Sequence, residues 1–223
     1  MINELAQSWQ TFGKDEHIPL HEYMMALSIR MVSSTQFGAY FQKPENIKTV
    51  AVLYHDLMKD SDDLLNGKLS PENKEKYQHF EAKCEKFKDE LRKMVKSHEL
   101  NGSSCEAPVL STLIQSQDEE LVLGDVTTLF IGGFHTTGNL LSWMFYYLAI
   151  HQDIQTKVFQ ELATNLGDKD MSFEDIPKLK YCSQVIEETL RLSVTAPFAA
   201  RISSEDMTVL GHNIPANTPI GEL

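Results

Sequence analysis

The stretch VTTLFIGGFHTTGNLLSWMFYYLAIHQ, residues 126–152, contains no Asp, Glu, Lys or Arg over 27 positions. It is long enough to cross a bilayer as one helix. It also holds three glycines and two histidines, its flanks at 118–120, 125 and 153 are acidic, and no Lys or Arg cluster adjoins it. We therefore predict a buried central helix, with a membrane span as the alternative.

Outward from this stretch, apolar residues recur at helical spacing through most of the chain. The pattern predicts helices over 20–32, 47–58, from Ser70-Pro71 to Asn101, from Pro108, around 154–162 and over 178–192. From Ala199 onward, short apolar runs broken by turn residues predict short strands. The fold class is therefore mainly α with a small β element at the C-terminal end. We expect residues 1–223 to form a single partial domain without a separate linker.

The amino-acid composition limits the kinds of partner that the protein can bind. The net charge is −12 and the pI is near 5.1, which disfavours nucleic acid and anionic lipid surfaces because both need Lys and Arg opposite them. The three cysteines, Cys84, Cys105 and Cys182, form no Cys-x-x-Cys pair and suit a reducing compartment. Residues 1–10 show neither a signal peptide nor an N-terminal anchor.

Two motifs carry potential chemistry. Gly132-Gly133-Phe134-His135-Thr136-Thr137 lies in the central helix, and Glu187-Glu188-Thr189-Leu190-Arg191 follows some 50 residues later. In this order and at this distance the pair resembles the oxygen-activating helix and the Glu-x-x-Arg helix of the cytochrome P-450 superfamily. The resemblance is specific over about 121–220 and includes Ala196-Pro197, Arg201 and the run 211–215.

The resemblance assigns roles within the central helix. Gly132 and Gly133 take the small-Gly place, where glycine lets a haem approach the backbone. Thr136, followed by Thr137, matches the threonine that delivers protons during oxygen activation. His135 stands where the family usually has a carboxylic acid, and histidine can also move protons near neutral pH. From the residues alone, a core helix whose threonines bond back to the preceding turn remains an equal alternative.

Two further assignments follow from the same resemblance. Glu188 and Arg191 match a structural ion pair beside the haem, and Arg201 matches an arginine that binds a haem propionate. Without the resemblance, Glu188 and Arg191 are an ordinary surface pair at i and i+3, and Arg201 is an exposed strand residue.

The family resemblance implies a haem-dependent monooxygenase, an oxidoreductase that inserts one atom of dioxygen into a small apolar substrate. It implies haem as cofactor, NADPH through a separate reductase as redox partner, and the endoplasmic reticulum membrane for full-length members. The family's iron ligand is a Cys in a loop after the Glu-x-x-Arg helix, and no cysteine follows Cys182 here. The expectation is an internal piece of an orphan, animal-type member, truncated at both ends, inactive as given and without its metal ligand.

A non-enzymatic helical polypeptide that binds a partner or associates with a membrane is the competing interpretation. A possible zinc pair, His17 and His21, is four residues apart, but Pro19 lies between them and no further ligand is near. A solvated helix start is the favoured interpretation of that segment.

Overall fold

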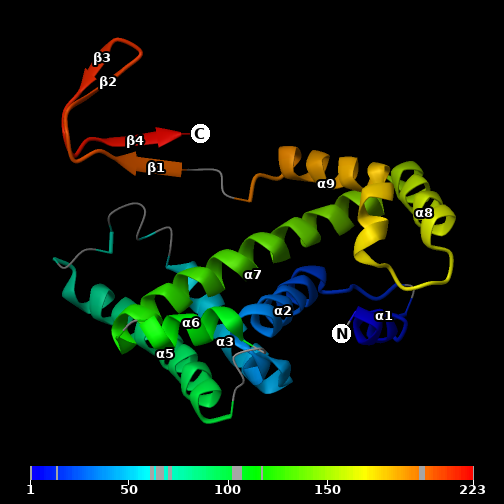
Figure 1. Cartoon of the computed structure of the whole chain (residues 1–223), viewed down its shortest axis with the longest axis horizontal. Coiled ribbons are helices and arrows are strands. Elements are labelled where there is room, and N and C mark those ends of the chain that lie inside the picture. The colour runs from blue at the N-terminus through cyan, green and yellow to red at the C-terminus, as the bar shows by residue number, and fades with distance from the viewer. Residues whose placement is uncertain are drawn as a thin grey trace. The chain divides into compact units, whose positions relative to one another are not determined.

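The computed structural model describes residues 2–13, 15–60, 63, 68–69, 72–101, 107–116, 118–195 and 199–222. Within these residues the chain is mainly helical, with two small two-stranded antiparallel sheets (Figure 1). The predicted fold class is confirmed. The chain divides into two compact units, Met1–Ser142 and Trp143–Leu223.

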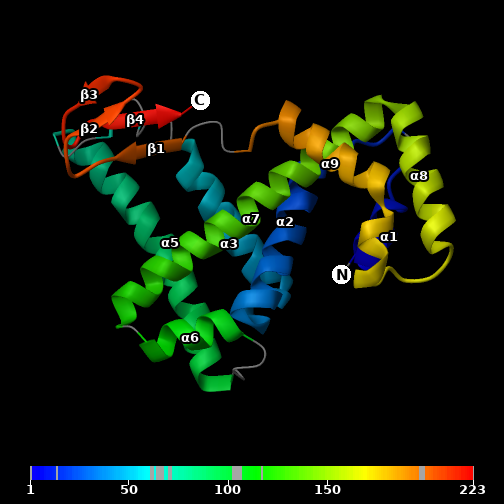
Figure 2. The same cartoon turned by 45° about the horizontal axis from the view of Figure 1, so that its top comes forward.

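The first unit is a group of helices built on the N-terminal part of the central helix α7. Helices α2 and α3 lie side by side in it (Figure 2). Its elements are α1 (Ile2–Trp9), α2 (Leu20–Val32), the π-helical η1 (Ser33–Phe37), the 3-10 turn η2 (Ala39–Gln42), α3 (Pro44–Lys59), α5 (Lys74–Asn101), α6 (Pro108–Ser116) and most of α7 (Glu119–Ile150).

One face of α7 forms the centre of the core. Val122, Val126, Phe130 and Phe134 recur every fourth residue and are buried. The Phe130 ring centroid lies 5.0 Å from those of Phe41 and Phe134, and such aromatic contacts add to the area that the rings bury. The predicted central helix is present, and the structure buries one of its faces rather than the whole helix. Among the described residues, no helix combines the length and apolarity that a bilayer crossing requires.

Two glycines let α2 approach α7 closely. A Cβ added at Gly138 would lie 2.5 Å from Met25 Sδ and 2.8 Å from Ser28 Oγ. A Cβ at Gly133 would lie 3.0 Å from Val32 Cγ1. Since Val32, Ser28 and Met25 follow one another along α2, the contact of the two helices depends on these missing side chains.

The second unit contains the end of α7, α8 (Gln152–Leu166), the 3-10 helix η3 (Phe173–Lys178) and α9 (Lys180–Leu192). Strands β1 (Ala199–Ile202) and β4 (Pro219–Glu222) pair antiparallel, as do β2 (Met207–Val209) and β3 (His212–Ile214). Leu210 and Gly211 connect β2 to β3 with positive φ values of 49° and 83°, as a two-residue hairpin turn requires. The predicted short strands are thus confirmed.

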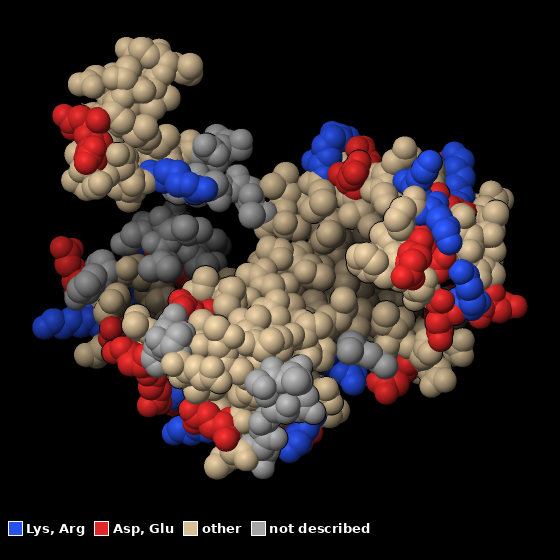
Figure 3. Space-filling model, viewed as in Figure 1, with Lys and Arg blue, Asp and Glu red and all other residues tan. Residues whose placement is uncertain are grey.

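Acidic and basic side chains intermingle over α8 and α9 (Figure 3). The Lys157–Asp153 and Arg191–Glu188 pairs belong to this surface. Exposed pairs of this kind contribute at most about 1 kcal/mol each. Their effect is to keep charge of one sign from gathering on this surface.

The Asp118 carboxylate caps the start of α7: its Oδ1 accepts hydrogen bonds from the backbone N–H groups of Glu120 and Leu121. The segment 175–177 is part of η3. The expected start at Ser70-Pro71 lies outside the described residues, and the described helix α5 begins at Lys74.

Candidate functional site

The candidate site is the face of α7 that carries Gly132 and Thr136. A Cβ built on Gly132 meets no atom of the described residues within 4 Å, and Leu129, one turn earlier, is 42% exposed. Phe130 and Phe134, on the other side of the helix, are completely or almost completely buried. The two glycines of the motif therefore have different surroundings: Gly133 packs against α2, whereas Gly132 leaves the helix backbone accessible.

Both threonines of the motif bond back along the helix. Thr136 Oγ1 donates to the carbonyl of Gly132 at 2.8 Å, and Thr137 Oγ1 donates to that of Gly133 at 3.0 Å. Thr127 and Thr128 make the same kind of bond, so the bond alone does not distinguish Thr136. Thr136 differs from Thr127 and Thr128 in its acceptor, because Gly132 is the residue whose missing side chain leaves the helix surface open.

His135 projects toward α2 and α3 rather than beside Thr136, because successive helical residues point about 100° apart. Its ring lies 5.4 Å, centroid to centroid, from Tyr54 of α3. Its Nε2 lies 3.0 Å from Asn139 Nδ2, which makes a hydrogen bond within α7. Burial, and secondarily the proximity of His21, lower the pKa of His135 below its usual value. The neutral imidazole is therefore favoured at neutral pH.

Glu188 and Arg191 form a two-point ion pair on α9. Arg191 Nε donates to Glu188 Oε2 at 2.7 Å, and Arg191 Nη2 donates to Oε1 at 2.6 Å. The hydrogen bonds from Arg191 lower the pKa of Glu188. The pair forms within α9. Both side chains are more than half exposed, so a further partner can reach them.

Arg201 lies on β1, opposite Ile220 of β4, and is exposed. It belongs to the second unit together with Glu188 and Arg191, whereas Gly132, His135 and Thr136 belong to the first. The structure brings the residues of the central motif together on one helix. It also brings Glu188 and Arg191 together.

Two carboxylates with a clear structural role were not singled out from the sequence. Glu161 of α8 accepts the backbone N–H groups of Tyr181 and Cys182 at 2.7 and 2.8 Å, and so caps α9 from outside. Asp175 is buried, caps η3 and bonds to Lys169 and Lys178. The spacing of Ser172 and Asp175 is a capping-box pattern that could have been found.

His17 and His21 are the two residues of the possible zinc pair. His21 Nδ1 lies 3.3 Å from Ser142 Oγ of α7. Within the part of the chain that the structure describes, no group of three or more His, Cys, Asp or Glu side chains could hold a metal ion.

The mainly helical fold, the glycine-and-threonine helix and the Glu-x-x-Arg helix agree with the family that the sequence resembles. The cytochrome P450 family model matches residues 1–221. The chain belongs to the cytochrome P450 family.

Curated relatives agree with this assignment. Cytochrome P450 20A1 of Mus musculus is 25% identical over 223 residues, covering 98% of this chain and 47% of the mouse protein. The cyclooctat-9-en-7-ol 5-monooxygenase of Streptomyces melanosporofaciens is 26% identical over 91% of this chain and 46% of its own length. A bifunctional cytochrome P450/NADPH–P450 reductase of Bacillus cereus is 24% identical over 95% of this chain. The chain spans about half the length of the first two relatives.

The described residues fit a haem on one side. The face at Gly132 offers a helix backbone with no side chain and no neighbour within 4 Å of the missing Cβ, as a flat cofactor needs. Burial raises the thiol pKa of Cys84 and of Cys182 and so disfavours their thiolate forms. Gly132 and Thr136 are therefore the residues of the first unit suited to contact haem.

Proposed function

We propose that the protein containing these residues is a haem-dependent monooxygenase that inserts one atom of dioxygen into a small apolar substrate. The observation that carries the proposal is the asymmetry of α7. The face of α7 that carries Phe130 is buried in the core. The face that carries Gly132 and Thr136, two residues of the family motif, is open. Haem, when bound, supplies the reductive activation of dioxygen.

In this proposal Thr136 holds the proton that the reaction consumes. Its hydroxyl hydrogen is directed at the Gly132 carbonyl, and rotation about the Cα–Cβ bond redirects it toward the open face. The Gly132 carbonyl also accepts a hydrogen bond within the helix. The Thr136 hydroxyl can therefore leave this carbonyl and donate its hydrogen bond to a different acceptor.

His135 is proposed as the proton source for this helix, in the place of the family's carboxylic acid. A neutral imidazole can accept a proton at one nitrogen and release one at the other. Burial lowers the pKa of His135, so the imidazole is mainly neutral at neutral pH. The Asn139 amide restrains the ring through the bond at Nε2.

Glu188, Arg191 and Arg201 are proposed to position the cofactor. The Glu188–Arg191 pair presents a preorganised guanidinium on α9. Arg201 offers a positive charge for a haem propionate. We further propose that electrons come from NADPH through a reductase. The Bacillus cereus relative, a bifunctional cytochrome P450/NADPH–P450 reductase, supports this partner.

The test uses the complete haem-bearing protein and compares product formed per NADPH consumed. Thr136→Ala should lower this ratio about tenfold or more, because an oriented proton donor is lost. Thr128→Ala is the matched control, since Thr128 makes the same back bond to Gly124. His135→Asp should raise the ratio by supplying a carboxylic acid. Equal ratios for the Thr136 and Thr128 variants would refute the assignment.

A further inference from the structure

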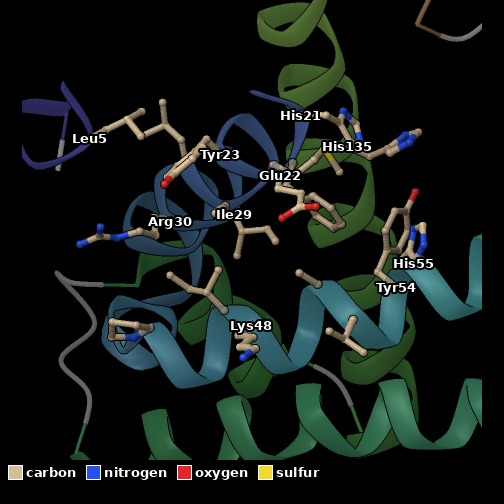
Figure 4. Close-up of a pocket in the computed structure, with 18 of the residues that line it drawn as sticks. Leu5, His21, Glu22, Tyr23, Ile29, Arg30, Lys48, Tyr54, His55 and His135 are labelled. Carbon is tan, nitrogen blue, oxygen red and sulfur yellow. The ribbon is translucent and has the colours of Figure 1, made fainter. Parts of the chain in front are cut away.

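A large pocket lies between α1, α2, α3 and one side of α7, within the first unit (Figure 4). Its volume is about 950 Å³, in the range typical of sites for small organic ligands. Phe134 and His135 are the α7 residues that line it, and Gly132 and Thr136 do not. It is therefore a different cavity from the open face described above.

The pocket has an apolar floor. Side chains of α2 and α3 provide it, chiefly Met25, Ala26, Ile29, Ile47 and Ala51. Ile29 and Ile47 are buried. The lining of α2 extends from His21 to Arg30, a rise of about 13 Å along the helix. A groove between two adjacent helices with this length suits a straight aliphatic chain.

Three histidines from three helices gather at one end of the pocket. His21 of α2, His55 of α3 and His135 of α7 lie toward the same side, with Tyr54 among them, whereas Leu5 and Arg30 lie at the other side (Figure 4). Three imidazoles at one end of an apolar groove form a polar end that can donate several hydrogen bonds.

The charges around the pocket favour an anionic ligand at that end. Glu4 is paired with Arg30 at 3.3 Å, and Asp56 is paired with Lys59 at 3.1 Å. Glu22 is the remaining carboxylate of the lining. Lys48 and the three imidazoles also line the pocket. In a chain with a net charge of −12, this is a local gathering of groups that are cationic or can become so.

We propose that this pocket binds one molecule of a straight-chain carboxylate, with its carboxylate at His21, His55 and His135 and its chain along α2 and α3. The carboxylate accepts N–H bonds from the imidazoles, and the chain covers the apolar floor. An imidazolium binds an anion more strongly than a neutral imidazole does. The proposal does not depend on haem, and it shares only His135 with the proposed reaction.

The test is calorimetric titration of the haem-free 223-residue chain with decanoate, with circular dichroism as the check of helix content. We expect one saturable site. Octanoate should bind about tenfold more weakly, because it lacks two methylenes. Decanol should bind about tenfold more weakly at acidic pH, because it lacks the charge-assisted bonds.

Variants locate the site. Ala51→Trp fills the floor of the groove and should abolish decanoate binding. Thr49→Trp is the control, because Thr49 is exposed on α3 outside this pocket. The His21→Gln, His55→Gln double variant should retain decanol binding and lose the preference for decanoate.

Any of four results would overturn the proposal. The first is that the chain is helical but does not bind decanoate. The second is that the Ala51→Trp and Thr49→Trp variants bind decanoate with equal affinity, and the third is that decanol binds as tightly as decanoate at acidic pH. Tighter binding of decyltrimethylammonium than of decanoate would also overturn it, and would indicate that Glu22 sets the preference. None of these measurements uses activity, so their failure leaves the monooxygenase proposal untouched.

Discussion

Alanine substitutions at Gly132 and Gly138 should have opposite effects on stability, although both glycines lie inside α7. At Gly138 the new Cβ would meet Met25 Sδ at 2.5 Å and the Met25 Cα at 3.2 Å. The sulfur can move with its side chain, but the Cα belongs to the α2 backbone. Overpacking of this kind costs about 1–3 kcal/mol, and the gain in helix propensity offsets about 1 kcal/mol. The expected net loss is up to about 2 kcal/mol.

At Gly132 the new Cβ meets nothing within 4 Å, so only the helix propensity changes. Gly132→Ala should stabilise the haem-free chain by about 1 kcal/mol and raise its thermal midpoint by about 2–4 °C for a chain of this size. The measurement is urea unfolding followed by far-UV circular dichroism. In the complete haem-bearing protein, the same variant should weaken haem binding, because the methyl group occupies the open face.

The two variants separate packing from function. A Gly138→Ala chain as stable as the parent would refute the close approach of α2 and α7. A Gly132→Ala variant that lost stability, or that bound haem as tightly as the parent, would refute the description of its face as the open, cofactor-facing side.

Four other outcomes are expected. Glu161→Ala should destabilise the second unit by about 1–2 kcal/mol, since two backbone N–H groups of α9 lose their acceptor; hydrogen exchange at the start of α9 checks this. Asp175→Asn should lower the thermal midpoint at neutral pH. Bonds from Lys178 and Ser172 lower the pKa of Asp175, so this stabilisation is present above the ordinary Asp pKa of about 4 and is lost as the pH falls below it, where the difference between variant and parent should shrink. The NMR titration midpoint of His135 should lie below its usual value, and His21→Ala should move it upward; no movement would exclude the influence of His21. Haem added to the 223-residue chain should give a histidine-type or weak spectrum, because burial keeps the Cys182 thiol protonated; a thiolate-type carbonyl band that disappears in Cys182→Ser would contradict this.

The central helix could be predicted because its pattern is local. The charge-free run and the glycine-threonine motif are both legible along 126–152, and the acidic flanks argued against a membrane span. The helical periodicity likewise located α3 and α9 to within a few residues. Features whose residues all lie in one helix or one short turn could be predicted from the sequence.

The difference between Gly132 and Gly133 could not be predicted. It depends on where Val32 lies, and Val32 is about a hundred residues away along the chain. The role of Glu161 was hidden for the same reason, because its partners lie 20 and 21 residues later with no pattern that links them. Contacts of this range require the tertiary structure.

The cap that Glu161 forms also bears on how related sequences can diverge. The start of α9 is held to α8 by Glu161, and its end is held through Ser193, whose hydroxyl lies 2.9 Å from that of Tyr147 in α7. The Glu-x-x-Arg helix is thus fastened at both ends by partners outside the connecting segment 167–171. Insertions and deletions should accumulate in that segment during evolution, because a change in its length leaves the direction of Glu188 and Arg191 unaltered.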